Sequence, residues 1–227
     1  MRIIAFGDVH MSARVCRHIP GIGSADLIIA TGDLTNYGRK GDAKKVLEEL
    51  LEVNPRLLAV LGNLDTIEIN DYLEQLDLNL HGQARLIQGK ICLIGAGGSN
   101  ITPFRTPTEF SEREITEILM RGYNQATEYI ALATPLHRCK IPMILVSHAP
   151  PHGTRVDRLR NGRHVGSTAV RSFIEKYQPE LCISGHIHEA KGEDTLGATR
   201  ILNPGMLQQG GWVDITLNAS TLNAILQ

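Results

Sequence analysis

Short, continuous apolar runs recur along this chain, and they constrain its fold more than any other feature of the sequence. Most of them show no alternation of apolar and polar residues, which is typical of strands that are buried on both faces. We therefore expect these runs to form strands at the centre of the protein. The runs are Ile3–Phe6, Leu27–Ala30, Leu57–Leu61, Ile91–Ile94, Met143–Val146 and Leu181–Ile183, with Arg200–Leu202 and Trp212–Leu217 as weaker examples.

Segments with helical periodicity separate several of these runs. The alternation of strands and helices predicts an α/β architecture with helices outside a layered sheet. No repeat, low-complexity segment or linker interrupts the chain, so residues 1–227 are predicted to form a single domain. The expected helices are Ala43–Val53, with Asp42 as the predicted N-cap, Ser111–Met120, which opens with a capping box, and Thr168–Tyr177.

Charge and composition argue against several classes of protein. The 227 residues carry a formal net charge of −1 and only 4% are aromatic, which argues against a basic nucleic-acid binder that stacks bases. No stretch reaches the roughly 20 apolar residues of a membrane span. The first residues also lack the apolar region of a secretory signal. The four cysteines form no CxxC pair, which favours a reduced, cytoplasmic protein. The oligomeric state is not predicted.

Side chains that can bind metal ions follow five of the apolar runs. Because ligands bind beyond the carboxyl ends of strands in a covered sheet, we expect these side chains to meet at one rim. A glycine precedes three of them and is expected to let the backbone turn tightly there. The predicted metal ligands are Asp8, His10, Asp33, Asn63, His148, His186 and His188.

This set of ligands predicts a particular chemistry. Carboxylate and amide oxygens together with imidazole nitrogens suit Mn, Fe, Zn, Ni or Co rather than Ca, and Mn is favoured. Seven ligands exceed what one metal ion takes from a protein, so we expect two divalent ions that share a bridging carboxylate. Two such ions promote in-line displacement at phosphorus.

The order of these motifs resembles the calcineurin-like metallophosphoesterase superfamily. The motifs are Asp8-Val9-His10, Gly32-Asp33, Gly62-Asn63-x-Asp65, His148 and Gly185-His186-x-His188. Thr35-Asn36, Asn203-Pro204-Gly205 and the Ser-His-Ala-Pro-Pro run at 147–151 are similar to the small Icc-related branch. The resemblance implies a β-sandwich flanked by helices, in four αββα layers. It also implies a phosphoesterase for small phosphate-ester substrates, with phosphodiesters favoured over monoesters.

The resemblance assigns a role to each motif residue. It implies that Asp8, His10 and His188 hold one metal ion. A second set, Asn63, His148 and His186, would hold the other, with Asp33 as the bridge. A hydroxide between the ions would attack phosphorus in line. Asp65 resembles a carboxylate that orients a neighbouring group, although its position also suits the N-cap of a helix that starts near Ile67.

One position departs from the family pattern. Leu64 stands where the superfamily usually has a histidine that protonates the leaving group or stabilises the transition state. General acid catalysis is typically worth about 10²–10⁴-fold. His152 is the predicted substitute, because it follows His148 by four residues on the same loop. The alternatives are activity confined to good leaving groups, or a metal-binding scaffold or protein-interaction module, as in the retromer subunit of this superfamily.

Several further predictions stay open at this point. Residues 151–166 carry four arginines against one aspartate, which suits either a basic lid over the substrate or an ordinary solvated loop. A nuclease related to DNA-repair members of the superfamily is a third function, against which the balanced charge argues. No role is predicted for His18, His81 and His137.

Overall fold

Two β-sheets make up the centre of the computed structural model, which describes residues 1–134, 140–218 and 221–227. His137 and Cys139 lie outside these described residues. The first sheet has the strand order β13 (Thr221–Leu226), β12 (Val213–Asn218), β1 (Arg2–Phe6), β2 (Leu27–Ala30) and β3 (Leu57–Ala59). The second has the order β10 (Gly192–Leu196), β11 (Thr199–Asn203), β9 (Leu181–Ile183), β8 (Met143–Ser147), β5 (Ile91–Ala96) and β4 (Ala84–Ile87). A short ribbon pairs β6 (Ser99–Asn100) with β7 (Glu109–Phe110).

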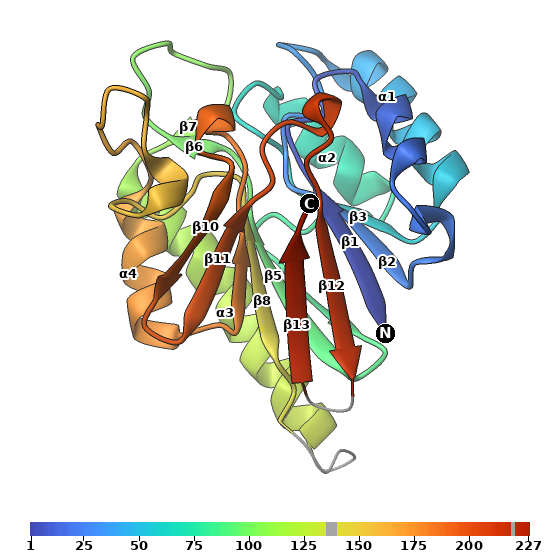
Figure 1. The fold of residues 1–227 in the computed structure, drawn as a ribbon, viewed down its shortest axis with the longest axis vertical. Coiled ribbons are helices and arrows are strands. Elements are labelled where there is room, and N and C mark those ends of the chain that lie inside the picture. The colour runs from blue at the N-terminus through green and yellow to red at the C-terminus, as the bar shows by residue number, and fades with distance from the viewer. Residues whose placement is uncertain (135–139, 219–220) are drawn as a thin grey trace.

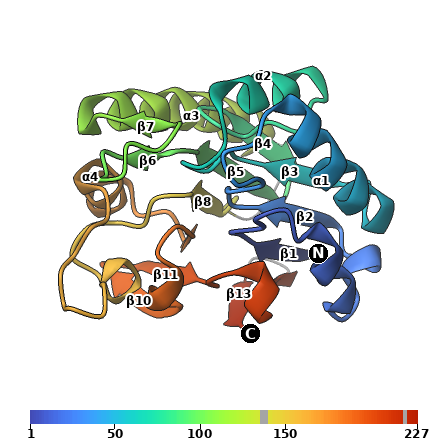
Figure 2. The same ribbon diagram turned by 90° about the horizontal axis from the view of Figure 1, so that it is seen from above.

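Helices cover the outer face of each sheet. Figure 1 shows α1 (Lys40–Val53) and α2 (Ile67–Gln75) along the first sheet, and α3 (Glu112–Ala133) and α4 (Thr168–Tyr177) along the second. Figure 2 shows the same arrangement from above. The predicted four-layer αββα sandwich is therefore confirmed.

Burial on both faces explains why the strand sequences are continuously apolar. In β1, Ile3 and Ala5 point into the core between the two sheets, whereas Ile4 and Phe6 point into the core beneath α1 and α2. A third core lies between the second sheet and the helices α3 and α4. Since successive side chains of a strand face opposite sides, a strand between two apolar cores needs apolar residues at every position.

All eight predicted strands are present, but the sequence analysis missed most of the strands at the sheet edges. The edge strands β10 and β13 carry exposed polar residues, and β4 contains Arg85 and is mostly half-buried, so none of the three has the continuous, buried apolar signal of the central strands. Polar edges of this kind discourage pairing with other chains. The helix α2 was likewise foreseen only through its expected start near Ile67.

Two helix predictions need correction at their ends. Asp42 is not the N-cap of α1, because this helix starts at Lys40 with Arg39 as N-cap, and a carboxylate oxygen of Asp42 accepts a hydrogen bond from the Arg39 N–H at 3.3 Å. The capping box of Ser111 and Glu114 is confirmed at the start of α3. That helix continues to Ala133, well beyond the predicted end at Met120, because its apolar face continues to pack on β4 and β5.

The topology directs the parallel strands toward one end of the molecule. The strands β1, β2 and β3 run parallel to one another, as do β5, β8 and β9 in the second sheet.

Among the described residues, no helix is both long and apolar enough to cross a membrane. The cytoplasmic location and the single domain stay predictions. The three described cysteines are buried free thiols, and burial raises the pKa of Cys16 to about 11.

Candidate metal centre

Four of the predicted ligands form a compact cluster where the two sheets meet. Ligand atoms of Asp8, His10, Asp33 and His188 all lie within 4.8 Å of one another. The Nε2 atoms of His10 and His188 are 3.1 Å apart, and Nε2 of His188 is 3.4 Å from Oδ1 of Asp8. Asp8 and Asp33 follow β1 and β2, whereas His188 follows β9 of the other sheet. The cluster therefore depends on both sheets.

A second group adjoins this cluster through Asp33. Nε2 of the fully buried His148 lies 2.9 Å from Oδ1 of Asn63 and 3.5 Å from Oδ1 of Asp33. The rings of His148 and His186 have their centroids 5.2 Å apart. Nδ1 of His148 donates to the carbonyl oxygen of Thr31 at 2.9 Å, which leaves Nε2 directed toward the group. The structure thus brings all seven predicted ligands to one place.

The backbone at these positions is held in an uncommon conformation. Asp8, His10, Asp33 and His186 are non-glycine residues with positive φ, between 45° and 67°. Such conformations are uncommon outside glycine and persist where the surrounding structure enforces them, often at functional sites. The backbone hydrogen bonds from Asp8 N–H to Gly32 and from His10 N–H to Asp33 lock these turns together.

Two glycines allow the ligand loops to approach each other, for different reasons. Gly32 has φ of 113°, as the expected tight turn requires, and a Cβ there would lie 2.4 Å from Nδ1 of His148. Gly62 has a φ that other residues also adopt, so a tight turn does not explain the glycine at this position. A Cβ on Gly62 would lie 2.0 Å from Oδ1 of Asp33, so only glycine leaves room for that carboxylate.

Burial and charge shift the pKa values of the site strongly. Burial by itself would lower the pKa of His148, but the carboxylates of Asp33 and Asp8 outweigh it and raise this pKa to about 9. Burial, followed by the charge of His148, lowers the pKa of His186 to about 4. Burial opposes the ionisation of Asp33, yet its pairing with His148 lowers the pKa of this carboxyl. Positive charge beside Asp33 therefore favours the ionised form of its carboxyl.

The residues present fit divalent metal ions. Oδ2 of Asp8 is fully buried and has no hydrogen-bond partner among the described residues. The described Lys and Arg side chains form no ion pair within 4.0 Å with Asp8 or Asp33, whose nearby basic groups are histidines. Buried carboxylates are normally paired or bound to a metal ion. Their combination with imidazole and amide donors suits a first-row transition metal.

Asp65 has a different position from the seven ligands. Its carboxylate accepts hydrogen bonds from the N–H groups of Leu34, Thr35 and Gly62 and from the Thr35 hydroxyl, at 2.8–3.0 Å. It therefore joins the loops after β2 and β3 and does not cap α2. Burial, followed by the charge of Asp33, raises the pKa of Asp65 to about 6.

The sequence model of one protein family, described as calcineurin-like phosphoesterase, matches residues 1–190. The chain belongs to the calcineurin-like phosphoesterase family. This phosphoesterase is therefore a hydrolase, from a family that uses divalent metal ions. It is 36% identical over 186 residues to the uncharacterized protein MJ1162 of Methanocaldococcus jannaschii, which covers 79% of this chain and 77% of that protein.

Solved structures share the fold of this phosphoesterase at low sequence identity. TT1561 of Thermus thermophilus superimposes with a TM-score of 0.65 at 18% identity, over 99% of this chain and 97% of that one. A dimetal phosphatase from Danio rerio gives a TM-score of 0.62 at 12% identity, over 100% and 95% of the two chains. These likenesses concern the fold alone.

A cavity of about 910 Å³ opens beside the candidate metal centre of the phosphoesterase. Three of the predicted ligands line it, namely Asn63, His186 and His188. Two loops at this end of the molecule, 101–108 and 150–167, form most of its other walls (Figure 1), and Glu189, Met206 and Gln209 help to complete them. The two loops contribute Ile101, Phe104, His152, Arg160, Arg163 and His164 among others.

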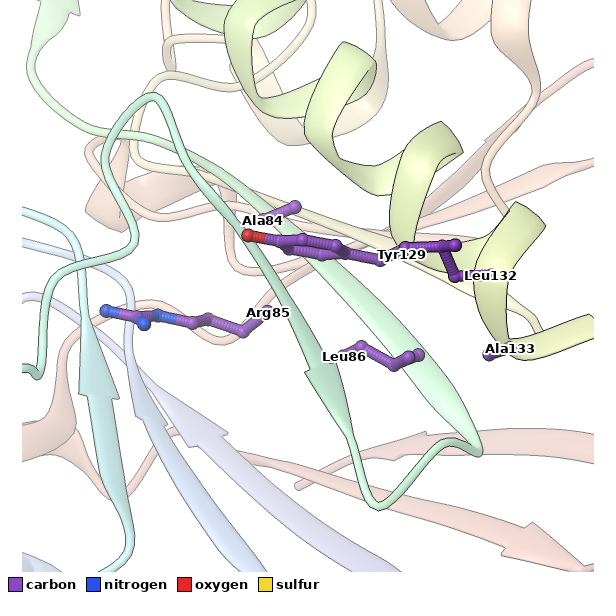
Figure 3. Close-up of a pocket in the computed structure, with 6 residues that line it drawn as sticks. All are labelled: Ala84, Arg85, Leu86, Tyr129, Leu132 and Ala133. Carbon is purple, nitrogen blue, oxygen red and sulfur yellow. The ribbon is translucent and has the colours of Figure 1, made fainter.

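Two of the histidines without a predicted role lie away from the candidate metal centre. His81 is structural, because its Nδ1 accepts a hydrogen bond from the Gly97 N–H at 2.9 Å and its ring stacks on Phe110. Burial, followed by the charge of Arg121, lowers the pKa of His81 to about 4. His18 is exposed. A separate depression of about 470 Å³ lies between β4 and α3. Figure 3 shows Leu86, Tyr129 and Leu132 around it, with the side chain of Arg85, which also lines it, extending away from α3.

Two side chains orient predicted ligands although the sequence analysis assigned neither of them this role. Oδ1 of Asn36 accepts from Nδ1 of His10 at 2.7 Å, which leaves Nε2 of His10 free as a ligand atom. The Asn63 amide donates to the Thr106 hydroxyl at 3.0 Å, and that hydroxyl donates to Glu109 at 2.7 Å. Thr35-Asn36 gave a motif signal for the first contact. Thr106 gave none, because it lies 43 residues from Asn63 in sequence.

We expect Thr106→Val to weaken the binding of one metal ion by about 10–100-fold, as is typical when a group that orients a ligand is lost. Valine keeps the shape of the side chain but removes the hydroxyl that fixes the Asn63 amide. Titration of metal-free protein with Mn²⁺, followed by calorimetry, measures the effect. Thr102→Val is the matched control, because Thr102 also donates to Glu109 but does not contact Asn63. Equal affinities in both variants would contradict this role of Thr106.

Proposed function

We propose that this chain is a dinuclear, metal-dependent phosphodiesterase. Asp8, His10 and His188 hold one metal ion in this proposal, Asn63, His148 and His186 hold the other, and Asp33 lies between them. The observation that carries the proposal is the meeting of two buried carboxylates and four histidines from both sheets at one cavity. Manganese is the metal that we favour. The dimetal phosphatase from Danio rerio, which shares this fold, supports the metal count that we propose.

The residues around the metal centre have separate tasks in this proposal. When bound, the metal ions supply Lewis acidity toward the phosphoryl oxygens and lower the pKa of a water molecule. Asn36, Thr31 and Thr106 orient ligand side chains through the hydrogen bonds described above. Arg160 and Arg163 line the cavity and attract the negative charge of the phosphate ester. Both side chains are exposed at the cavity wall, so we expect them to contribute to substrate binding.

Metal removal tests the proposed function. Protein stripped with EDTA is expected to lose hydrolysis of bis(p-nitrophenyl) phosphate, and Mn²⁺ is expected to restore it. Turnover of p-nitrophenyl phosphate, a monoester with the same leaving group, is expected to be slower. If the protein binds two equivalents of metal and still turns over neither ester above the background rate, the phosphoesterase proposal is wrong. Faster monoester turnover would contradict only the preference for diesters.

A second candidate function is a metal-binding scaffold for another protein. The observation in its favour is Leu64, which cannot transfer a proton at a position where the family usually has a histidine. Tyr37, whose N–H donates to the Leu64 carbonyl, is 58% exposed, and Ile67 is 55% exposed. These apolar side chains adjoin the loop that carries Asn63. The scaffold predicts metal binding without hydrolysis, which the metal-reconstitution experiment detects.

A further inference from the structure

The loop between β8 and α4 contains a buried carboxylate that the proposed function does not use. Asp157 is fully buried, and its two oxygens accept hydrogen bonds from the N–H groups of Gly153, Thr154 and Gly166 at 2.9–3.0 Å. Burial opposes its ionisation, but His164 and these N–H groups lower its pKa. Asp157 is therefore a fixed negative charge inside the loop.

His164 is the partner of this carboxylate. Its Nδ1 lies 2.6 Å from Oδ1 of Asp157. Because a carboxylate only accepts, Nδ1 must carry a proton. Nε2 is left without a hydrogen-bond partner among the described residues, and the side chain is 37% exposed and lines the cavity. A buried acid that orients a histidine toward a reactive space is the arrangement of many catalytic dyads.

The loop is held firmly against the metal centre. Arg158 and His164 form an antiparallel bridge within it. The Arg160 N–H donates to Glu189, the residue after His188, at 2.8 Å, and the Asn100 amide donates to the Val165 carbonyl at 3.1 Å. The sequence left a mobile basic lid and a solvated loop as alternatives. The observed contacts instead describe a docked wall of the cavity.

We propose that His164, oriented by Asp157, protonates the leaving-group oxygen of a phosphodiester bound in the cavity. The inference rests on the proposed function. In this role His164 donates the proton that the side chain of Leu64 cannot donate. His164 is favoured over His152, the substitute predicted from sequence, since no described residue forms a hydrogen bond with the ring of His152. Asp157 acts through His164 and is a positioning residue.

The proton balance of the step is simple. As the phosphorus–oxygen bond to the leaving group breaks, a new bond forms between phosphorus and the oxygen of a water molecule. His164 enters this step as an imidazolium, with a proton on each ring nitrogen, so the leaving oxygen takes the proton from Nε2 and departs as an alcohol while Nδ1 keeps its proton toward Asp157. The attacking water releases one proton to solvent, and His164 regains one from solvent. No further reactant is needed.

The test compares two diesters that differ only in their leaving groups. The p-nitrophenolate of ethyl p-nitrophenyl phosphate leaves readily without a proton, whereas the phenolate of ethyl phenyl phosphate needs one. In the Mn²⁺-loaded protein, His164→Gln is expected to lower kcat/KM for the phenyl ester about 10²–10³-fold and for the p-nitrophenyl ester less than about tenfold. Asp157→Asn is expected to show the same selectivity with a smaller loss.

Each outcome of this comparison decides a different point. Equal losses on the two esters in His164→Gln would overturn the assignment and leave the proposed function intact. A selective loss in His152→Gln and not in His164→Gln would assign the proton to His152. A wild-type protein that hydrolyses neither ester would overturn the proposed function and this inference together. One that hydrolyses only the p-nitrophenyl ester would overturn the inference alone. The exposed His18→Gln is the neutral control.

Chemical rescue keeps the proposal testable if Gln distorts the loop. His164→Ala opens space in the cavity wall, so added imidazole is expected to restore phenyl-ester turnover in proportion to its concentration. No rescue in a variant whose circular dichroism spectrum and Mn²⁺ content match the wild type would contradict the proposal.

Discussion

Asp33→Asn is expected to lower phosphodiester hydrolysis by at least about 10³-fold and to reduce the bound metal from two ions to at most one. Asparagine keeps the oxygen that accepts the Leu64 N–H at 2.8 Å, so the loop is expected to keep its shape. It removes the charge that lies between the two groups of ligands. A metal ion supplies several kcal/mol of transition-state stabilisation, which corresponds to this loss of rate.

Two measurements check this result on one sample. Mass spectrometry of the metal content and a kinetic assay with bis(p-nitrophenyl) phosphate report binding and catalysis separately. Asp71→Asn is the matched control, because the side chain of Asp71 is exposed on α2 and belongs to none of the ligand motifs. If Asp33→Asn keeps both metal ions and most of its activity, Asp33 does not lie between them. If the wild type binds two ions and has no activity, the scaffold is favoured.

Asp65→Asn is expected to lower the free energy of unfolding by about 3 kcal/mol. The carboxylate of Asp65 accepts four hydrogen bonds in a fully buried place. An asparagine must direct its NH₂ group at one pair of these donors, which leaves buried N–H groups unsatisfied. For a chain of this size the melting temperature is expected to fall by about 6–12 °C.

Denaturant unfolding in EDTA measures this loss without a contribution from metal binding. The measurement is best made at pH 8, where Asp65, with its pKa near 6, is ionised. Asp71→Asn again serves as the control and is expected to change the free energy of unfolding by less than about 0.5 kcal/mol. A loss below about 1 kcal/mol in Asp65→Asn would mean that these hydrogen bonds stabilise the loops little.

The fold prediction missed most edge strands and ended the helix α3 too early. The central strands were predictable because both of their faces lie in apolar cores, which imposes an apolar residue at every position. The strand β10, with the sequence Gly-Glu-Asp-Thr-Leu, has no such constraint, because it pairs on one side only. Its pairing with β11 is decided by a short turn and by the sheet already present.

The sequence by itself determined which seven side chains, the predicted ligands, meet at one rim, because the carboxyl ends of parallel strands lie together there and motifs at those ends are visible in the chain. Only the tertiary structure decided how the ligands are held. Thr106 reaches Asn63 across 43 residues, and His164 meets Asp157 only when the loop folds into a hairpin. A hydrogen bond of this kind forms only if the donor–acceptor distance is right to within a few tenths of an ångström. Packing in the folded chain sets that distance, and a pattern of residues in the sequence does not predict it.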